Sequence, residues 1–137
     1  MIDWVLEVFS KYAVFTGRAR RKEYWYWYLF NFLISLLIVA ASMVITLTYE
    51  SETNNGIGGF SLFFNLLSLL YSLGIFIPNL AVTVRRLHDT NRSGWTFFIS
   101  LIPLIGGIIL LVYLVEDGTP GDNQYGPNPK AGVGTTA

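Results

Sequence analysis

Val84-Arg-Arg-Leu-His-Asp-Thr-Asn-Arg-Ser-Gly-Trp95 is a short, basic and turn-rich stretch that separates two long apolar parts of the chain. Residues 26–48 and 60–84 lie before it and residues 95–115 after it, and none of these runs contains Asp, Glu, Lys, Arg or His. At about 1.5 Å per residue, about 20 helical residues cross a hydrocarbon core of about 30 Å. The sequence therefore predicts an all-α integral membrane protein with three transmembrane helices, the third barely long enough.

Composition supports a membrane protein and excludes several kinds of site. Hydrophobic residues make up 53% of the 137 residues and charged residues only 13%, about half of the roughly 25% in soluble domains. The chain has no cysteine, which excludes disulfides and thiolate sites, and its single histidine, His88, excludes a site of several imidazoles. No metal site, cofactor or catalytic residue is predicted.

The predicted organisation has three parts. Residues 1–14 form a short amphipathic helix, which either lies in the membrane interface or packs on the transmembrane helices. Residues 15–115 form the three-span transmembrane domain, and residues 116–137 form a polar, turn-rich and flexible tail.

Proline and glycine interrupt two of the spans. Pro78 should kink the second helix, and Asn79 beside it could bond either a freed backbone group or a neighbouring helix. Pro103 and the pair Gly106-Gly107 interrupt the third span. That pattern permits close helix packing, a kink or a re-entrant turn.

Lysine and arginine are strongly segregated along the chain. The 49–59 loop has none and the tail has only Lys130, whereas eight others precede the first span or join the second to the third. These eight are Lys11, Arg18, Arg20, Arg21, Lys22, Arg85, Arg86 and Arg92. Because cytoplasmic loops carry the excess of Lys and Arg, we expect a cytoplasmic N-terminus, with the 49–59 loop and the tail outside. A re-entrant third segment would return the tail to the cytoplasm.

Three motifs, in this order, resemble one bacterial family. They are Phe15-Thr-Gly-Arg-Ala-Arg-Arg-Lys-Glu-Tyr-Trp25, Arg85-Arg-Leu-His-Asp-Thr-Asn-Arg-Ser-Gly-Trp95 and Gly118-Thr-Pro-Gly-Asp-Asn-Gln-Tyr-Gly126. From about Val8 to Lys130 the chain resembles the YhaH/YhaI-type inner-membrane proteins, a domain-of-unknown-function family. The resemblance implies a small multi-span protein of the bacterial inner membrane. It carries over no reaction, substrate or catalytic residue.

The two basic motifs are predicted to share one face of the membrane and to form one anion-binding pocket. Spans one and three would both begin there, each with free N–H groups and the positive end of its dipole. Helix N-termini and guanidinium groups together suit a phosphate-bearing head group. The candidate binding residues are Arg18, Arg20, Arg21, Lys22, Arg85, Arg86 and Arg92, with Glu23, His88 and Asp89 as possible polar partners.

A purely local structural role is the alternative for these cations, and it is the favoured interpretation. They would then only set topology, with Arg20 paired to Glu23, and with Arg85 or Arg92 paired to Asp89.

His88 and Asp89 could form an acid–base pair, but adjacent residues on a helix rarely face each other. A turn in which Asp89 or Asn91 caps the third helix is the favoured interpretation.

The predicted function is a non-enzymatic membrane module that binds anionic phospholipid, a membrane-protein partner or further copies of itself. Two alternatives stay open, an oligomeric small transporter or channel and an interfacial enzyme acting on a phosphate-bearing lipid. Against transport, the spans lack the ionisable groups that usually mark coupled transport. Nucleic-acid binding is not expected, because the basic residues are tied to membrane boundaries.

Overall fold

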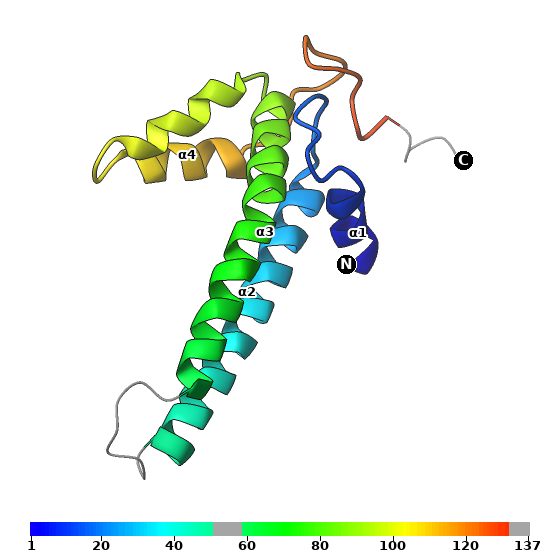
Figure 1. The fold of residues 1–137 in the computed structure, drawn as a ribbon. Helices are drawn as coiled ribbons and strands as arrows, with labels where there is room; N and C mark the ends of the chain where they lie inside the picture. The colour runs from blue at the N-terminus through cyan, green and yellow to red at the C-terminus, as the bar shows by residue number, and fades with distance from the viewer. Residues whose placement is uncertain (51–58, 132–137) are drawn as a thin grey trace. The chain divides into compact units, whose positions relative to one another are not determined.

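The computed structural model describes residues 1–50 and 59–131, and these residues form a helical protein. The elements in chain order are α1 (Ile2–Ser10), α2 (Arg21–Ile45), the π-helical η1 (Thr46–Glu50), α3 (Gly59–Asp89), the 3₁₀ helix η2 (Gly94–Leu101) and α4 (Gly106–Val115) (Figure 1). Apart from one isolated bridge, from Asn123 to Gly126, the described residues contain no β-structure. The all-α prediction is confirmed, while residues 51–58 of the predicted polar loop lie outside the described residues.

The chain divides into two compact units. The first consists of Met1–Trp27 together with Ile77–Ala137, and the second of Tyr28–Phe76. Both basic motifs, η2, α4 and the tail belong to the first unit, and the second contains the remaining lengths of α2 and α3. All of the predicted binding residues therefore belong to one unit.

α1 is the amphipathic helix that the sequence predicts near the N-terminus. Val5 and Val8 are buried, and the Phe9 ring meets the Trp27 ring of α2 edge-on, with centroids 5.0 Å apart. Ile2 and Leu6 remain exposed. One strip of the helix thus packs on the protein, as one of the two interpretations expected, and a second apolar strip stays uncovered.

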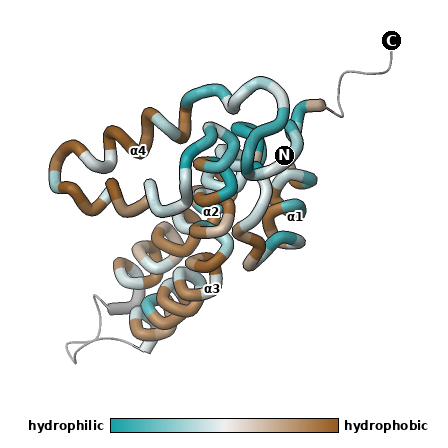
Figure 2. Tube along the Cα trace, turned by 90° about the horizontal axis from the view of Figure 1, so that it is seen from above, coloured by the Kyte–Doolittle hydropathy of each residue, from teal (hydrophilic) through white to brown (hydrophobic). Residues whose placement is uncertain are grey.

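α2 and α3 supply the two helices that are long and apolar enough to cross a membrane. The candidate spans run from Arg21 to Thr48 and from Ser61 to Asp89, and only 6% and 22% of their most apolar stretches are buried. A core helix of a soluble protein would be mostly covered, so this exposed apolar surface fits a helix surrounded by lipid. Hydrophobic residues dominate both helices (Figure 2).

Polar side chains in these helices bond to one another. In the second unit, the Tyr71 hydroxyl donates to Asn31 Oδ1 at 2.7 Å. In the first unit, Trp27 Nε1 donates to Asn79 Oδ1 at 2.6 Å, while Pro78 lies inside α3 without ending it. Asn79 therefore bonds a neighbouring helix, which was one of the two roles expected for it.

The third predicted span is not one helix, and that prediction is wrong. η2 ends at Leu101, residues 102–105 form a turn, and α4 folds back along η2 (Figure 1). Pro103 has no N–H with which to continue a helix, and Leu104 has a φ of 68°, in the left-handed region. Of the options left open by the sequence, a reversal of chain direction is realised here.

The hairpin of η2 and α4 closes tightly at Gly106. A Cβ at this position would lie 2.0 Å from the Ile99 carbonyl oxygen of η2. The corresponding position on Gly107 has nothing within 4 Å. Close packing therefore requires a glycine at the first member of the Gly-Gly pair and leaves the second unconstrained.

Candidate functional site

Asp89, the last residue of α3, is at the centre of a buried ionic cluster. Its carboxylate accepts hydrogen bonds from Arg18 Nε at 3.0 Å and from Arg86 Nη1 at 2.5 Å, and all three side chains are buried. A carboxylate at a helix C-terminus opposes the helix dipole, and the two guanidinium groups offset that cost. The two basic motifs therefore come together around a carboxylate of the same chain.

A second buried ion pair joins the same two motifs. Glu23, in the first turn of α2, accepts a hydrogen bond from Arg85 Nη1, and both side chains are buried. The Ala19 N–H donates to the Arg85 carbonyl oxygen at 2.9 Å. Nε and Nη2 of Arg85 are buried and have no hydrogen-bond partner among the described residues. The pair thus holds the two motifs together. The hydrogen-bonding capacity of its guanidinium group is only partly used.

The ion pairs differ from those expected under a purely local role. Glu23 pairs with Arg85 instead of Arg20, and Asp89 pairs with Arg18 and Arg86. The expected partners of these two carboxylates were therefore wrong, because the end of α3 packs against the segment that leads into α2.

The tail is held against this cluster by hydrogen bonds. Arg18 donates from Nη1 to the Gly121 carbonyl oxygen at 2.7 Å and from Nη2 to that of Thr119 at 2.8 Å. The Thr119 N–H donates to the Asp89 carbonyl oxygen at 2.8 Å. The tail, which was expected across the membrane from the basic motifs, instead lies in contact with them. The reason is the hairpin of η2 and α4, both ends of which lie beside α3.

Arg86 also binds the C-terminal end of α4. Its Nε donates to the Leu114 carbonyl oxygen at 3.0 Å, and its Nη2 donates to the carbonyl oxygen of Glu116. The last carbonyl groups of a helix have no partner within the helix, and a cation there interacts favourably with the dipole. One guanidinium group therefore joins α3, α4 and the beginning of the tail.

His88 and Asp89 do not form the acid–base pair that their adjacency allowed. His88 Nδ1 lies 3.1 Å from the Gly17 carbonyl oxygen, to which it must donate, and the His88 ring stacks on Tyr125 with centroids 4.0 Å apart. Asp89 instead binds the two arginines described above. The imidazole therefore joins the first basic motif to the tail.

The prediction that Asp89 or Asn91 caps the helix after the basic stretch was also wrong. Ser93 caps η2, with its hydroxyl oxygen accepting from the Trp95 N–H, whereas Asp89 binds arginine and Asn91 accepts from Gln124 Nε2. Asn91 has a φ of 60°, so it turns the chain between α3 and η2.

The remaining cations lie nearer the surface. Arg21 binds Asp117 at 2.8 Å, and this hydrogen bond and charge lower the pKa of Asp117 below its ordinary value. Arg92 binds Glu116 at 2.6 Å and lies over the Tyr113 ring, 3.9 Å from its centroid.

Arg20 and Lys22 differ from the other candidate cations. The Arg20 guanidinium lies 5.7 Å from the centroid of the Trp4 ring, and Lys22 is exposed. Within residues 1–50 and 59–131, neither side chain has a carboxylate partner. The seven predicted binding residues thus separate into five that are paired within the chain and two that are not.

Two of the cavities in the first unit are lined by residues of the basic motifs. One is apolar, about 450 Å³ in volume, and lies between α3 and η2. Its lining residues are Phe15, Leu80, Val84, His88, Ser93, Gly94, Trp95, Phe97 and Phe98. The other is smaller and more polar, about 230 Å³, and lies where the tail passes Arg18 and Asp89. His88 is the one titratable residue in the lining of the apolar cavity.

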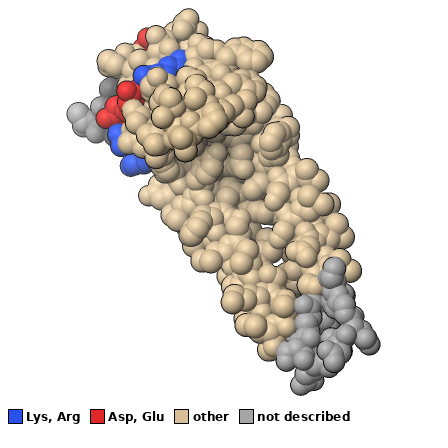
Figure 3. Space-filling model, turned by 90° about the vertical axis from the view of Figure 1, so that its left-hand side faces the viewer, with Lys and Arg blue, Asp and Glu red and all other residues tan. Residues whose placement is uncertain are grey.

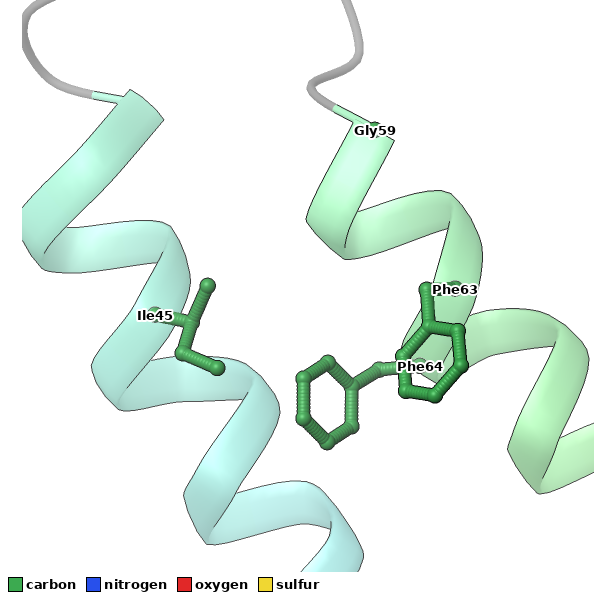
Figure 4. A pocket seen from close by; sticks show the side chains of 4 residues that line it. All are labelled: Ile45, Gly59, Phe63 and Phe64. Carbon is green, nitrogen blue, oxygen red and sulfur yellow. The ribbon is translucent and has the colours of Figure 1, made fainter.

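A further apolar cavity of about 570 Å³ belongs to the second unit. Ile45 of α2 faces Gly59, Phe63 and Phe64 of α3, and the Phe64 ring points toward α2 (Figure 4). None of these four described lining residues is titratable.

The tail supplies the part of the site that the sequence did not predict. Thr119 and Gly121 contribute backbone carbonyl groups, Asn123 donates from Nδ2 to the His88 carbonyl oxygen at 2.9 Å, and Tyr125 stacks on the imidazole. The motif Gly118–Gly126, which accompanies the two basic motifs in the sequence, could have indicated that the tail belongs to the site. In the described part of the chain, no group of three His, Asp or Glu side chains could hold a metal ion.

Comparisons with known proteins agree on one family. A family model described as "Protein of unknown function (DUF805)" matches residues 12–127. The chain is 40% identical over 129 residues to "Inner membrane protein YhaH" of Escherichia coli strain K12, covering 94% of this chain and 98% of that protein. It is also 40% identical over 131 residues to "Inner membrane protein YhaI" of the same strain, covering 96% and 98%. No solved structure is significantly similar to the chain.

Proposed function

The chain belongs to the DUF805 family and is similar to bacterial inner-membrane proteins, and we propose that it is a non-enzymatic membrane module that binds anionic lipid head groups. The proposed contact residues are Arg20, Arg21 and Lys22, at the beginning of α2. The buried arginines 18, 85 and 86 hold the two motifs and the tail together and are left out of the lipid contact.

The observation that carries this proposal is the unequal pairing of the cations. Three of the seven candidate cations are buried against Asp89 or Glu23, whereas Arg20 and Lys22 have no carboxylate partner in the described residues. Arg21 pairs with Asp117, and this pair is exposed, with side chains 43% and 70% accessible. Exposed pairs contribute little, so a phosphate group can compete with Asp117 for Arg21.

Their place in the helix supports the same proposal. Cations in the first turn of a helix oppose its dipole and so cost stability. An external anion would offset the part of this cost that the chain's own carboxylates do not offset. Five aromatic residues follow directly, Tyr24 to Tyr28, and aromatic side chains of this kind concentrate at the level of lipid head groups. The charged atoms also gather on the first unit, as Figure 3 shows for one face. Anionic phospholipid is therefore the ligand that we propose.

Native mass spectrometry of the protein in mild detergent tests this proposal. Phosphatidylglycerol and phosphatidylethanolamine would be added separately, and the fraction of protein that retains each lipid would be measured. We expect the wild type to prefer the anionic lipid. The double variant Arg20→Gln/Lys22→Gln should lose roughly thirtyfold in affinity if each cation contributes about 1 kcal/mol.

The matched control is the double variant Lys11→Gln/Lys130→Gln. It removes the same charge from two exposed lysines that are already paired with Glu7 and Asp117, so the lipid preference should remain. Equal retention of both lipids by the wild type, or an equal loss in the two double variants, would contradict specific binding at α2. A stoichiometric co-purifying protein without lipid would favour a membrane-protein partner instead.

A further inference from the structure

The hairpin of η2 and α4 exposes an unusual amount of apolar side chain. Leu104 at its turn is 94% exposed, Trp95 at its beginning 79%, and Leu101 72%. Between residues 94 and 115 the chain has no charged side chain. Such a surface requires a covering that is itself apolar.

The composition of α4 shows what kind of covering fits. α4 has the sequence GGIILLVYLV, with apolar residues around its whole circumference rather than on one side. An interfacial helix has a strongly polar face toward water, and α4 has none. A helix that is hydrophobic all round belongs in a protein core or in hydrocarbon, and only Gly106, Leu110 and Leu114 are buried.

Both ends of the hairpin lie beside the same buried cluster. At the beginning, a Cβ on Gly94 would lie 2.8 Å from a methyl group of Val84, so η2 starts in close contact with α3. At the end, the Leu114 and Glu116 carbonyl groups bind Arg86, as described above. Arg92 spans the two ends, because it precedes η2 and binds Glu116.

The arms are too short to cross a bilayer. η2 has 8 residues and α4 has 10, so at about 2.0 and 1.5 Å per residue each arm is about 15 Å long. The hydrocarbon core is about 30 Å thick, so each arm matches about one leaflet.

Three N–H groups at the turn meet a condition that hydrocarbon imposes on the backbone within it. Backbone N–H groups in lipid must be bonded internally. The Ile102 N–H donates to Ile99, that of Ile105 to Pro103, and that of Gly106 to Ile102, all within the hairpin. Pro103 has no N–H to satisfy.

We propose that η2 and α4 form a membrane-embedded hairpin that enters the acyl region of one leaflet and returns to the same interface. The lipid acyl chains cover its apolar side chains, and the ionic cluster around Asp89 holds both of its ends. The protein would thus contact the bilayer through two spans and one element that does not cross. This proposal does not depend on head-group binding at α2.

The natural absence of cysteine makes the test direct, because each single-cysteine variant carries one reactive thiol. The four variants are Ser93→Cys and Asp117→Cys at the ends, and Leu104→Cys and Ile108→Cys near the turn. In sealed membrane vesicles of known orientation, a membrane-impermeant maleimide should label both end positions from the same side. The two turn positions should be labelled only after detergent is added.

A second measurement identifies what covers the turn. An environment-sensitive fluorophore on Leu104→Cys or Ile108→Cys, in reconstituted vesicles, should be quenched by lipids with a doxyl group on the acyl chain and not by iodide. Labelling of the two ends from opposite sides would overturn the proposal in favour of a spanning helix. Quenching by iodide would show a hairpin in water, and protection from both quenchers would show a protein partner or a second copy; either result also overturns it.

Discussion

At the scale of single residues, Asp89 has the largest structural role in the cluster, because one buried carboxylate binds two buried guanidinium groups. Asp89→Asn would leave Arg18 and Arg86 buried without a counter-charge. Removing one partner of a buried pair typically costs about 3–5 kcal/mol. We therefore expect a large fall in the thermal unfolding midpoint in detergent, together with faster proteolysis of the tail.

Asp117→Asn is the matched control for that substitution. It makes the same chemical change in an exposed pair with Arg21, so the unfolding midpoint should hardly move. If the two variants were equally stable, the buried cluster would have no special role in holding the first unit together.

The Glu23–Arg85 pair leads to a different prediction, because two nitrogen atoms of Arg85 are buried without a partner. A buried pair contributes net stability only when its remaining groups are also hydrogen-bonded. Arg85→Met alone should destabilise the protein by several kcal/mol, since Glu23 would keep an uncompensated charge. The double variant Glu23→Leu/Arg85→Met should be about as stable as the wild type in a double-mutant cycle. Additive losses in the cycle would contradict this.

At the scale of elements, the hairpin depends on the close approach of α4 to η2 at Gly106. Gly106→Ala would place a methyl group against the Ile99 carbonyl oxygen, so the two arms must separate. Overpacking of this kind costs about 1–3 kcal/mol. Gly107→Ala meets nothing and should stabilise α4 by up to about 1 kcal/mol. Unfolding midpoints of the two variants in the same detergent check this, and a fall of similar size in both would contradict it.

The two long helices could be predicted from sequence and the hairpin could not. Residues 26–48 and 60–84 are uninterrupted uncharged runs of ample length, so α2 and α3 follow from composition alone. The run 95–115 has the composition of a span, but its path depends on the left-handed Leu104. Leucine has no preference for that conformation, and the Pro-Gly pattern around it fitted three different paths.

The candidate site was predictable to a similar degree. That the two basic motifs meet follows from a helical hairpin, which places their positions on one side of the membrane. The partners of the arginines did not follow, because Arg18 bonds backbone carbonyl groups of Thr119 and Gly121, and every residue type offers the same carbonyl group. Arg86 is buried and Lys22 is exposed, and this difference likewise depends on three-dimensional packing that the sequence pattern does not show.

At the scale of the whole molecule, the docked tail strengthens the charge asymmetry on which the orientation depends. With Lys130 close to Asp117 and the basic motifs, all nine Lys and Arg residues and seven of the nine acidic residues belong to the first unit, and the other two acidic residues are Glu50 and Glu52. The first unit thus carries a formal net charge of +2 and the second a formal net charge of −2. Because positive charge is retained in the cytoplasm, we expect both the N-terminus and the tail to be cytoplasmic.

Single-cysteine variants in intact cells with a permeabilised outer membrane would measure this orientation. Asn55→Cys in the loop should react with an impermeant maleimide added from outside, whereas Asp3→Cys and Asp122→Cys should react only after the inner membrane is opened. Labelling of Asp122→Cys together with Asn55→Cys would separate the tail from the arginines and contradict the docked tail. If Asp3→Cys and Asp122→Cys were labelled from outside and Asn55→Cys were not, the docked tail would be supported but the orientation would be the reverse of the one expected. The segregation of the cations would then not explain the topology.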